Sequence, residues 1–183
     1  MIDAFVQWHF PERSYDKDAE IARKGTVHPE LLQALKKNPF FQAPFPKSTG
    51  PELFNLEYVQ KAIAESQTEQ LSIEDVLATL TRFSAETVAE ALVVAIQQTE
   101  TATTDFTVYV SGGGMHNPLL MDYLKELVPC SFKNTDEIGI SGDAKEAILF
   151  AVLANETVSG GTTNFGINNG IPSVTMGKIS FPD

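Results

Sequence analysis

Three consecutive glycines, Gly112, Gly113 and Gly114, join a predicted strand to a predicted helix. The strand covers residues 106–111, which are rich in β-branched and aromatic side chains, and Pro118 lies where a first helical turn tolerates a missing N–H group. Glycines accept positive φ and leave no Cβ in the way, so backbone N–H groups and the positive end of the helix can face a phosphate or a nucleoside. The junction therefore predicts a nucleotide site, although a tight turn without a ligand could use the same residues.

Asn117 distinguishes this glycine turn from one common nucleotide motif. Gly112 and Gly114 match the first two glycines of GxGxxG, and Asp136 follows a second predicted strand, as an acidic ribose ligand would. Asn117, however, occupies the position of the third glycine. The pattern Gly-Gly-Gly-x-x-Asn therefore disfavours a dinucleotide-binding oxidoreductase.

Glu146 is the candidate catalytic carboxylate. It lies in the first turn of a predicted helix, residues 144–157, where the helix dipole stabilises a negative charge. Ordinary helix-end electrostatics would account for it, but the glycines in residues 139–142 could place this turn beside the turn at 112–114. We expect Glu146 and the triple glycine to border one nucleotide and sugar crevice. Asp3 could pair with Glu146 only if the fold brings them together.

Lys47, Ser48 and Thr49 form the third candidate group. A lysine and two hydroxyls before a glycine can bind anions or sugar hydroxyls, although Ser-Thr-Gly before a helix is also an ordinary N-cap. The segment is not a Walker A loop, because GxxxxGK[ST] is absent. No metal site built from protein ligands is predicted, since the three histidines lack metal-ligand spacing. Only His116, beside the glycine turn, is a possible neighbour of a ligand.

Composition excludes several classes of protein. The 183 residues are enough for one domain, and 24 acidic against 13 basic side chains give a net charge of −11. Nucleic acid and anionic membranes are poor partners for such a surface. Cys130 is the only cysteine, so neither a disulfide framework nor a zinc site is expected. We expect a soluble, cytoplasmic protein, since no apolar run reaches the roughly 18 residues of a membrane-spanning helix.

The elements that must position these residues are mostly helices. Strands are predicted at 106–111 and 131–134, and alternation with helices favours a small parallel sheet in a helix-rich α/β fold. A loop with three phenylalanines, residues 39–46, should cover a core or line a pocket. The tail is predicted as a loop over 159–169 and as partly extended chain over 171–179. Helices are predicted over residues 1–9, 18–24, 28–35 and 51–66, from Ser72, from Ser84, from Pro118 and over 144–157.

Taken in order, these motifs resemble the C-terminal half of the anhydro-N-acetylmuramic acid kinases. That family is a branch of the superfamily of sugar kinases, heat-shock ATPases and actin, and it is related to levoglucosan kinase. The resemblance covers nearly the whole chain and rests on these segments: Ile2-Asp3-Ala4, Tyr15-Asp16-Lys17-Asp18 with Ala22 and Gly25, Pro46 to Gly50 with Glu52 and Phe54, Val110 to Pro118, Gly139 with Lys145-Glu146-Ala147 and Phe150-Ala151, and Pro172-Ser173-Val174-Thr175.

The resemblance implies a fold, a reaction and two cofactors. Residues 1–183 would form the actin-like (ribonuclease H-like) C-terminal domain of a kinase that uses ATP and Mg²⁺ to open a 1,6-anhydro sugar hydrolytically and phosphorylate O6 in peptidoglycan recycling. Gly112, Gly113, Gly114 and Asn117 would then lie on the adenosine and phosphate side, and Glu146 would face the sugar and its attacking water. Lys47, Ser48 and Thr49 remain the candidates for substrate binding.

Departures from the family pattern limit what we expect of this chain. In the family, an Asp-Thr-Gly-Pro-Gly-Asn segment with the catalytic aspartate precedes Ile-Asp-Ala, whereas here residues 2–4 follow directly after Met1. The N-terminal lobe and the first strands of the sheet would also lie upstream, and Pro51 replaces a usual arginine. We therefore expect little kinase activity from the chain alone, and either self-association as a homo-oligomer or pairing with the missing half. A non-catalytic binding or assembly module is the alternative.

Overall fold

The computed structural model describes residues 1–98, 105–160 and 177, and the chain divides into two compact units. The first unit comprises residues 1–109 and 113–133, and the second comprises residues 110–112 and 134–183. Of the tail predicted as loop over 159–169 and as extended chain over 171–179, only residues 159, 160 and 177 are described, and Ser159 ends a helix rather than beginning a loop.

The described part of the first unit is mostly helical, and several of its helices follow the predicted apolar patterns. The predicted helices at 1–9 and 28–35 are confirmed, and so is a helix beginning at Pro118. The helices are α1 (Ile2–His9), α2 (Pro29–Leu35), α3 (Leu56–Ser66), α4 (Ile73–Gln97) and α5 (Pro118–Leu127). Among the described residues, no helix combines the length and the apolar character needed to cross a membrane.

The prediction of a second helix starting at Ser84 is wrong, because α4 runs unbroken for 25 residues. Ser72 does cap α4, since its hydroxyl accepts a hydrogen bond from the Asp75 N–H at 3.0 Å. The Ser84 hydroxyl instead donates to the carbonyl of Leu80 at 2.9 Å, four residues back. A serine inside a helix can make this bond, so serine alone does not mark a helix start.

Two other predicted helices differ from the structure. The segment predicted as a helix at 18–24 forms two short 3-10 turns, Lys17–Ala19 and Ala22–Lys24. The helix predicted to open at Pro51 starts only at Leu56, because the Asn55 side chain caps it by accepting from Tyr58 N–H at 3.0 Å. In both cases a side-chain oxygen, from Asp16 or from Asn55, accepts hydrogen bonds from backbone N–H groups and so determines the local conformation.

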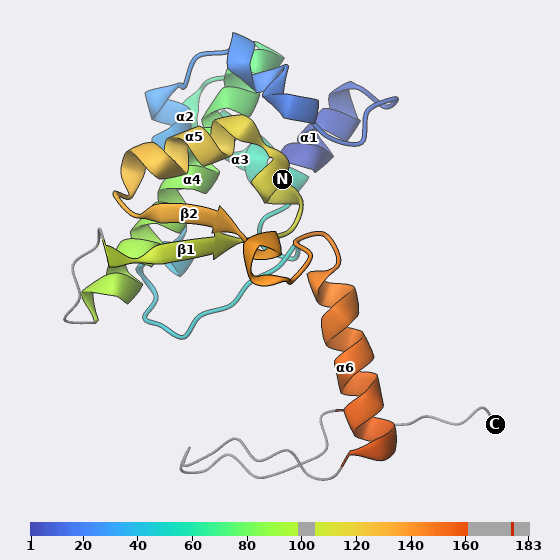
Figure 1. Ribbon diagram of the computed structural model, residues 1–183. Helices are drawn as coiled ribbons and strands as arrows, with labels where there is room; N and C mark the ends of the chain where they lie inside the picture. Colours follow the sequence, from blue (N-terminus) through green and yellow to red (C-terminus); the bar gives the residue numbers. More distant parts are fainter. Residues whose placement is uncertain (99–104, 161–176, 178–183) are drawn as a thin grey trace. The chain divides into compact units, whose positions relative to one another are not determined.

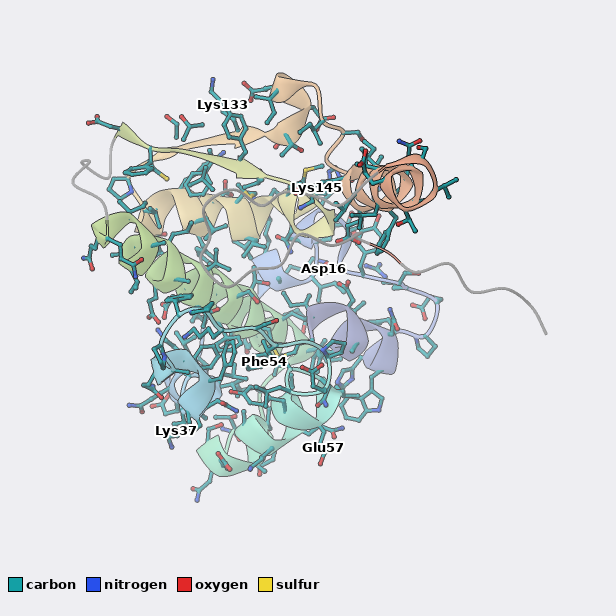
Figure 2. All side chains as sticks on the ribbon, turned by 90° about the horizontal axis from the view of Figure 1, so that it is seen from below. Asp16, Lys37, Phe54, Glu57, Lys133 and Lys145 are labelled. Atoms are coloured by element: carbon teal, nitrogen blue, oxygen red, sulfur yellow. The ribbon has the colours of Figure 1, made fainter. Side chains whose placement is uncertain are left out.

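The main core of the first unit lies around the N-terminal half of α4. Leu77 and Leu80 are completely buried there, together with Leu31 and Leu35 of α2. The phenylalanine loop covers this core as predicted: Phe41 lies 5.4 Å from Phe54 and 5.6 Å from Phe83, ring centre to ring centre. Figure 2 labels Phe54 among the side chains of this region.

A second apolar cluster joins α4 and α5 to the sheet. Leu124 and Val128 are buried against Ala85 and Ala89 of α4, and Phe132 packs against the same cluster. The sheet consists of β1 (Thr107–Val110) and β2 (Ser131–Asn134), which run side by side in the same direction (Figure 1). A helix-rich α/β fold with a small parallel sheet is thereby confirmed.

The second unit contains α6 (Lys145–Ser159) after a 3-10 turn, Thr135–Ile138. Gly139 ends that turn in the left-handed region, at φ +78°, which only glycine adopts without strain. Several large apolar side chains of α6 are exposed, and Phe150 keeps 68% of its surface accessible. The helix is apolar around most of its circumference, a pattern typical of helices that are buried on several sides.

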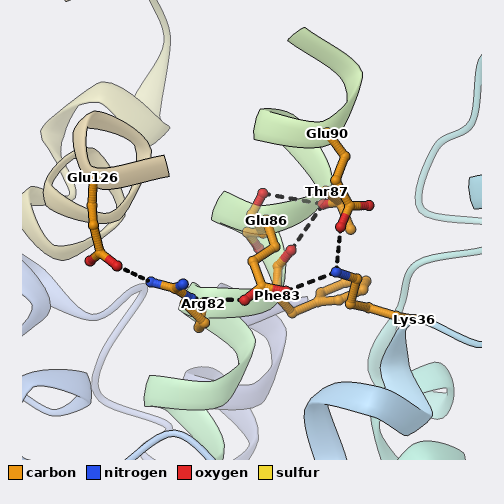
Figure 3. A network of polar contacts seen from close by, with 8 residues as sticks. Lys36, Arg82, Phe83, Glu86, Thr87, Glu90 and Glu126 are labelled. Atoms are coloured by element: carbon orange, nitrogen blue, oxygen red, sulfur yellow. Dashed lines mark hydrogen bonds and ion pairs between the residues drawn. The ribbon is translucent and has the colours of Figure 1, made fainter. Parts of the chain in front are cut away.

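A chain of ion pairs ties α4 to its neighbours in the first unit (Figure 3). Glu86 accepts from Lys36 at 2.8 Å and from Arg82 at 2.9 Å, while Arg82 also reaches Glu126 at 3.3 Å. Burial alone would raise the pKa of Glu86, but the hydrogen bonds from Lys36 and Arg82 outweigh it and lower that pKa. The network therefore stabilises the carboxylate form, and it links α2, α4 and α5.

Replacing Glu86 with glutamine is expected to destabilise the first unit by about 1–2 kcal/mol at neutral pH, because two charge-assisted hydrogen bonds weaken. Since the folded-state pKa of Glu86 is depressed, its contribution is present above the ordinary value of 4.5 and is lost as the pH falls below it. Urea unfolding at pH 7 and pH 3.5 measures both effects. Glu65→Gln is the matched control, since Glu65 and Lys61 form an exposed pair at 3.8 Å. Equal losses for both variants would contradict the account.

Replacing Gln67 with glycine is expected to stabilise the protein by about 0.5–1 kcal/mol. Gln67 ends α3 in the left-handed region at φ +55°, where a Cβ is unfavourable and glycine is the common residue. Gln98 provides the control, because it ends α4 at φ −74° and its replacement by glycine brings no such gain. Thermal unfolding of the two variants compares them, and a gain for both or for neither would contradict the assignment.

Candidate functional site

The first unit contains a pocket of about 870 Å³, within the range of small-molecule sites. Its lining comes from residues 1–3 at the start of α1, from residues 15–18, from Ser84 of α4 and from five residues between 113 and 120. Segments far apart in the sequence thus meet at one cavity, which includes part of the glycine turn.

Gly113 and Gly114 line this pocket and begin a 3-10 turn, Gly113–His116. A Cβ at Gly113 would meet no atom within 4 Å, and one at Gly114 would meet only Leu120 at 3.6 Å. The space beside Gly113 is therefore open, and a Cβ at Gly114 would touch Leu120 without a clash. The first N–H groups of a helical turn have no partner within that turn, so they can face a ligand.

Asn117 has a structural role at the end of the turn. Its Oδ1 accepts a hydrogen bond from the Leu120 N–H at 3.0 Å, so Asn117 is the N-cap of α5, and it also lines the pocket. The capping hydrogen bond uses the side-chain oxygen of Asn117 and not its NH₂ group. His116, kept as a possible neighbour of a ligand, lines the same pocket.

Gly112 differs from the two glycines that follow it. Its backbone lies in the left-handed region at φ +81°, which favours glycine. Its N–H donates a hydrogen bond to the Gly142 carbonyl at 3.0 Å. The Gly142 N–H lies 3.4 Å from Asp136 Oδ2, so within the second unit these bonds connect Gly112 to the loop that contains Gly142. The N–H of Gly112 thus has a protein partner, and a contact between Gly112 and a nucleotide stays a prediction.

Glu146 is exposed in the first turn of α6, as the sequence predicts. It belongs to the second unit, whereas Gly113 and Gly114 belong to the first. The crevice that Glu146 and the triple glycine were expected to share therefore stays a prediction. What the second unit does contain is the hydrogen bond between Gly112 and Gly142, four residues before Glu146.

Lys47, Ser48 and Thr49 do not line the pocket at the glycine turn. The Lys47 ammonium donates to the carbonyls of Phe40 and Phe41 at 3.0 and 2.8 Å and lies 5.0 Å from the Phe45 ring centre. The lysine thus fastens the phenylalanine loop. Its role in substrate binding, together with that of Ser48 and Thr49, stays a prediction.

Asp3 and the four residues from Tyr15 to Asp18 line the other wall of the pocket. The sequence offered Asp3 only as a possible partner of Glu146 and as part of the family pattern, and it offered residues 15–18 only as part of that pattern. Their spacing from the glycine turn, about 100 residues, gave no signal that they share its cavity. Among the described residues, no group of three or more His, Cys, Asp or Glu side chains could hold a metal ion.

Comparison with known proteins identifies the group to which this chain is similar. The family model described as Anhydro-N-acetylmuramic acid kinase matches residues 1–180. A relative of that name from Pseudoalteromonas atlantica is 52% identical over all of this chain and 45% of its own length. Those from Streptomyces avermitilis and Hahella chejuensis are 44% and 39% identical, over 91% and 97% of this chain and 41% and 44% of their own lengths.

The chain thus spans about 45% of the length of the relatives it matches most fully. The match includes the residues of the pocket, because it covers this chain from residue 1 to residue 180. The family model matches nearly all of the chain, and a relative from this family is 52% identical to it. The chain therefore belongs to the anhydro-N-acetylmuramic acid kinase family.

Proposed function

We propose that this chain forms the nucleotide-binding part of a kinase that opens the 1,6-anhydro ring of anhydro-N-acetylmuramic acid with water and phosphorylates O6 from ATP. The observation that carries the proposal is the turn at Gly113 and Gly114, which lies open in a ligand-sized pocket of a chain from this kinase family. On this proposal the protein acts in peptidoglycan recycling and has an actin-like fold of the ribonuclease H class.

Phosphoryl transfer depends mainly on positioning and on neutralising negative charge. The N–H groups of Gly113 and Gly114 and the N-terminus of α5 would face the phosphate chain. Glu146 would orient the water that attacks the anomeric carbon, while the freed O6 attacks the γ-phosphoryl group. A group that deprotonates this water must come within hydrogen-bond reach of it. We expect the complete reaction to need groups that the relatives carry outside the matched 45% of their length.

Magnesium fits this site only as a partner of the nucleotide. Mg²⁺ prefers oxygen ligands and is commonly bound through one or two carboxylates, water and substrate phosphates. Asp3 and Asp18 supply carboxylates at the pocket, while no cluster of three protein ligands occurs among the described residues. Bound in this way, Mg²⁺ would neutralise charge on the phosphates.

Titration calorimetry with ATP and Mg²⁺ tests the proposal, with NAD as a control. Saturable binding of ATP and no binding of NAD are expected. A folded chain with no affinity for ATP would contradict the proposal and favour an assembly module built on the kinase scaffold. We expect the chain to need a companion, either a second copy or the missing N-terminal half. Light scattering in the same buffer tests this expectation, and a stable dilute monomer would contradict it.

A further inference from the structure

Four consecutive residues, Tyr15 to Asp18, line the pocket that also contains Gly113 and Gly114. They form no regular helix, because Asp18 and Ala19 both lie in the left-handed region at φ +55° and +57°. For residues other than glycine this conformation costs roughly 1–2 kcal/mol each. Backbone strain of this kind persists only where surrounding contacts enforce it, and it often occurs at functional sites.

The contacts that enforce it come from Asp16 (labelled in Figure 2). Its side chain is buried, and its two carboxylate oxygens accept hydrogen bonds from the N–H groups of Ile21 and Ala22, both at 2.9 Å. The Asp16 carbonyl also accepts from the Ala19 N–H at 3.2 Å. Asp16 thus fixes the whole turn from both its side chain and its backbone.

Lys17 is the residue that this arrangement presents at the pocket. It is the only lysine or arginine among the described residues that line the cavity, whereas Asp3, Asp16 and Asp18 contribute carboxylates. Its carbonyl accepts from the Glu20 N–H at 3.0 Å, so its backbone is fixed while its side chain is exposed. A triphosphate in a pocket with three carboxylates needs positive partners besides a metal ion, and Lys17 is the basic side chain that the described lining supplies.

We propose that Lys17 contacts the phosphate groups of the nucleotide in this pocket and that Asp16 is the residue that positions it. This inference rests on the proposed function, and it adds a specific phosphate contact on the wall built from residues 15–18. It would also account for the strained backbone at Asp18 and Ala19, which directly follow Lys17.

Calorimetric titration of the full chain with Mg²⁺-ATP, inorganic triphosphate and adenosine tests the proposal. Lys17→Ala should weaken binding of ATP and triphosphate about tenfold or more and leave adenosine unchanged, while Lys17→Arg should keep most of the affinity. Lys24→Ala is the matched control, since Lys24 is exposed on the adjacent 3-10 turn and does not line the pocket. It should leave all three affinities unchanged.

Asp16→Asn is the second variant, and it tests the positioning of Lys17. Asparagine can accept a hydrogen bond only through its Oδ1, so its NH₂ group would face the N–H of Ile21 or Ala22 and one of the two bonds would be lost. Asp16→Asn should lower ATP affinity, and adding Lys17→Ala should lower it little further. If the unaltered chain binds ATP but Lys17→Ala binds it equally well, the Lys17 contact is refuted while the proposed function stands. If the unaltered chain binds neither ATP nor triphosphate, both are refuted.

Discussion

Replacing Gly25 with alanine is expected to destabilise the protein by about 3 kcal/mol or more. A Cβ at this position would lie 2.1 Å from the Glu74 carbonyl oxygen and 2.6 Å from the Asp75 nitrogen. These are backbone atoms at the start of α4, so relief requires the helix or the loop to move. The neighbouring Thr26 N–H also donates to Asp75 Oδ1 at 2.7 Å, and this contact opposes the movement.

Thermal unfolding measures this effect, and a loss of 3 kcal/mol corresponds to a fall of about 6–12 °C in the midpoint. Gly25 has φ −91° and ψ 169°, which alanine adopts freely, so the loss is purely steric. Gly113→Ala is the matched control, because its Cβ would meet nothing within 4 Å. Equal midpoints for the two variants would show that the close approach of residues 25 and 74 is wrong.

Replacing Gly113 with valine is expected to weaken ATP binding at least tenfold and to leave the unfolding midpoint within about 2 °C. The open space beside Gly113 tolerates a side chain, so the fold survives. The same branched side chain, however, occupies the pocket beside the N–H groups that the phosphate would approach. Gly113→Ala should give an intermediate loss. Titration calorimetry of the two variants measures the series, and undiminished affinity for the valine variant would contradict the proposed site.

The sequence predicted best those elements whose signals are local. β2 (Ser131–Asn134) has the predicted bounds, α1 begins within one residue of its prediction, and Ser72 is the predicted cap. The errors lie where one side chain redirected the backbone. The Asp16 side chain accepts from two backbone N–H groups where a helix was predicted, and this segment forms two 3-10 turns instead. The Asn55 side chain caps α3, so that helix starts later than predicted. Such hydrogen bonds depend on a few atoms and leave no periodic signal in the sequence.

The candidate site was predictable only in part, for a different reason. The glycine turn gave a signal by itself, because three adjacent glycines are costly unless the backbone needs them. Tyr15 and Lys17 gave none, since only the packing of α4 and α5 brings their segment to the same cavity as Gly114. The hydrogen bond of Gly112 gave no signal either, because its partner, Gly142, lies 30 residues away in sequence.

The most direct test of the central claim is an ¹⁵N NMR titration of the chain with Mg²⁺-ATP, following the backbone amide signals of Gly113 and Gly114. Both signals should shift and saturate with one dissociation constant, together with that of Lys17, while the amide of Gly25 stays in place. Binding of ATP that leaves the signals of Gly113 and Gly114 unchanged would contradict the account, because the nucleotide would then lie elsewhere on the molecule.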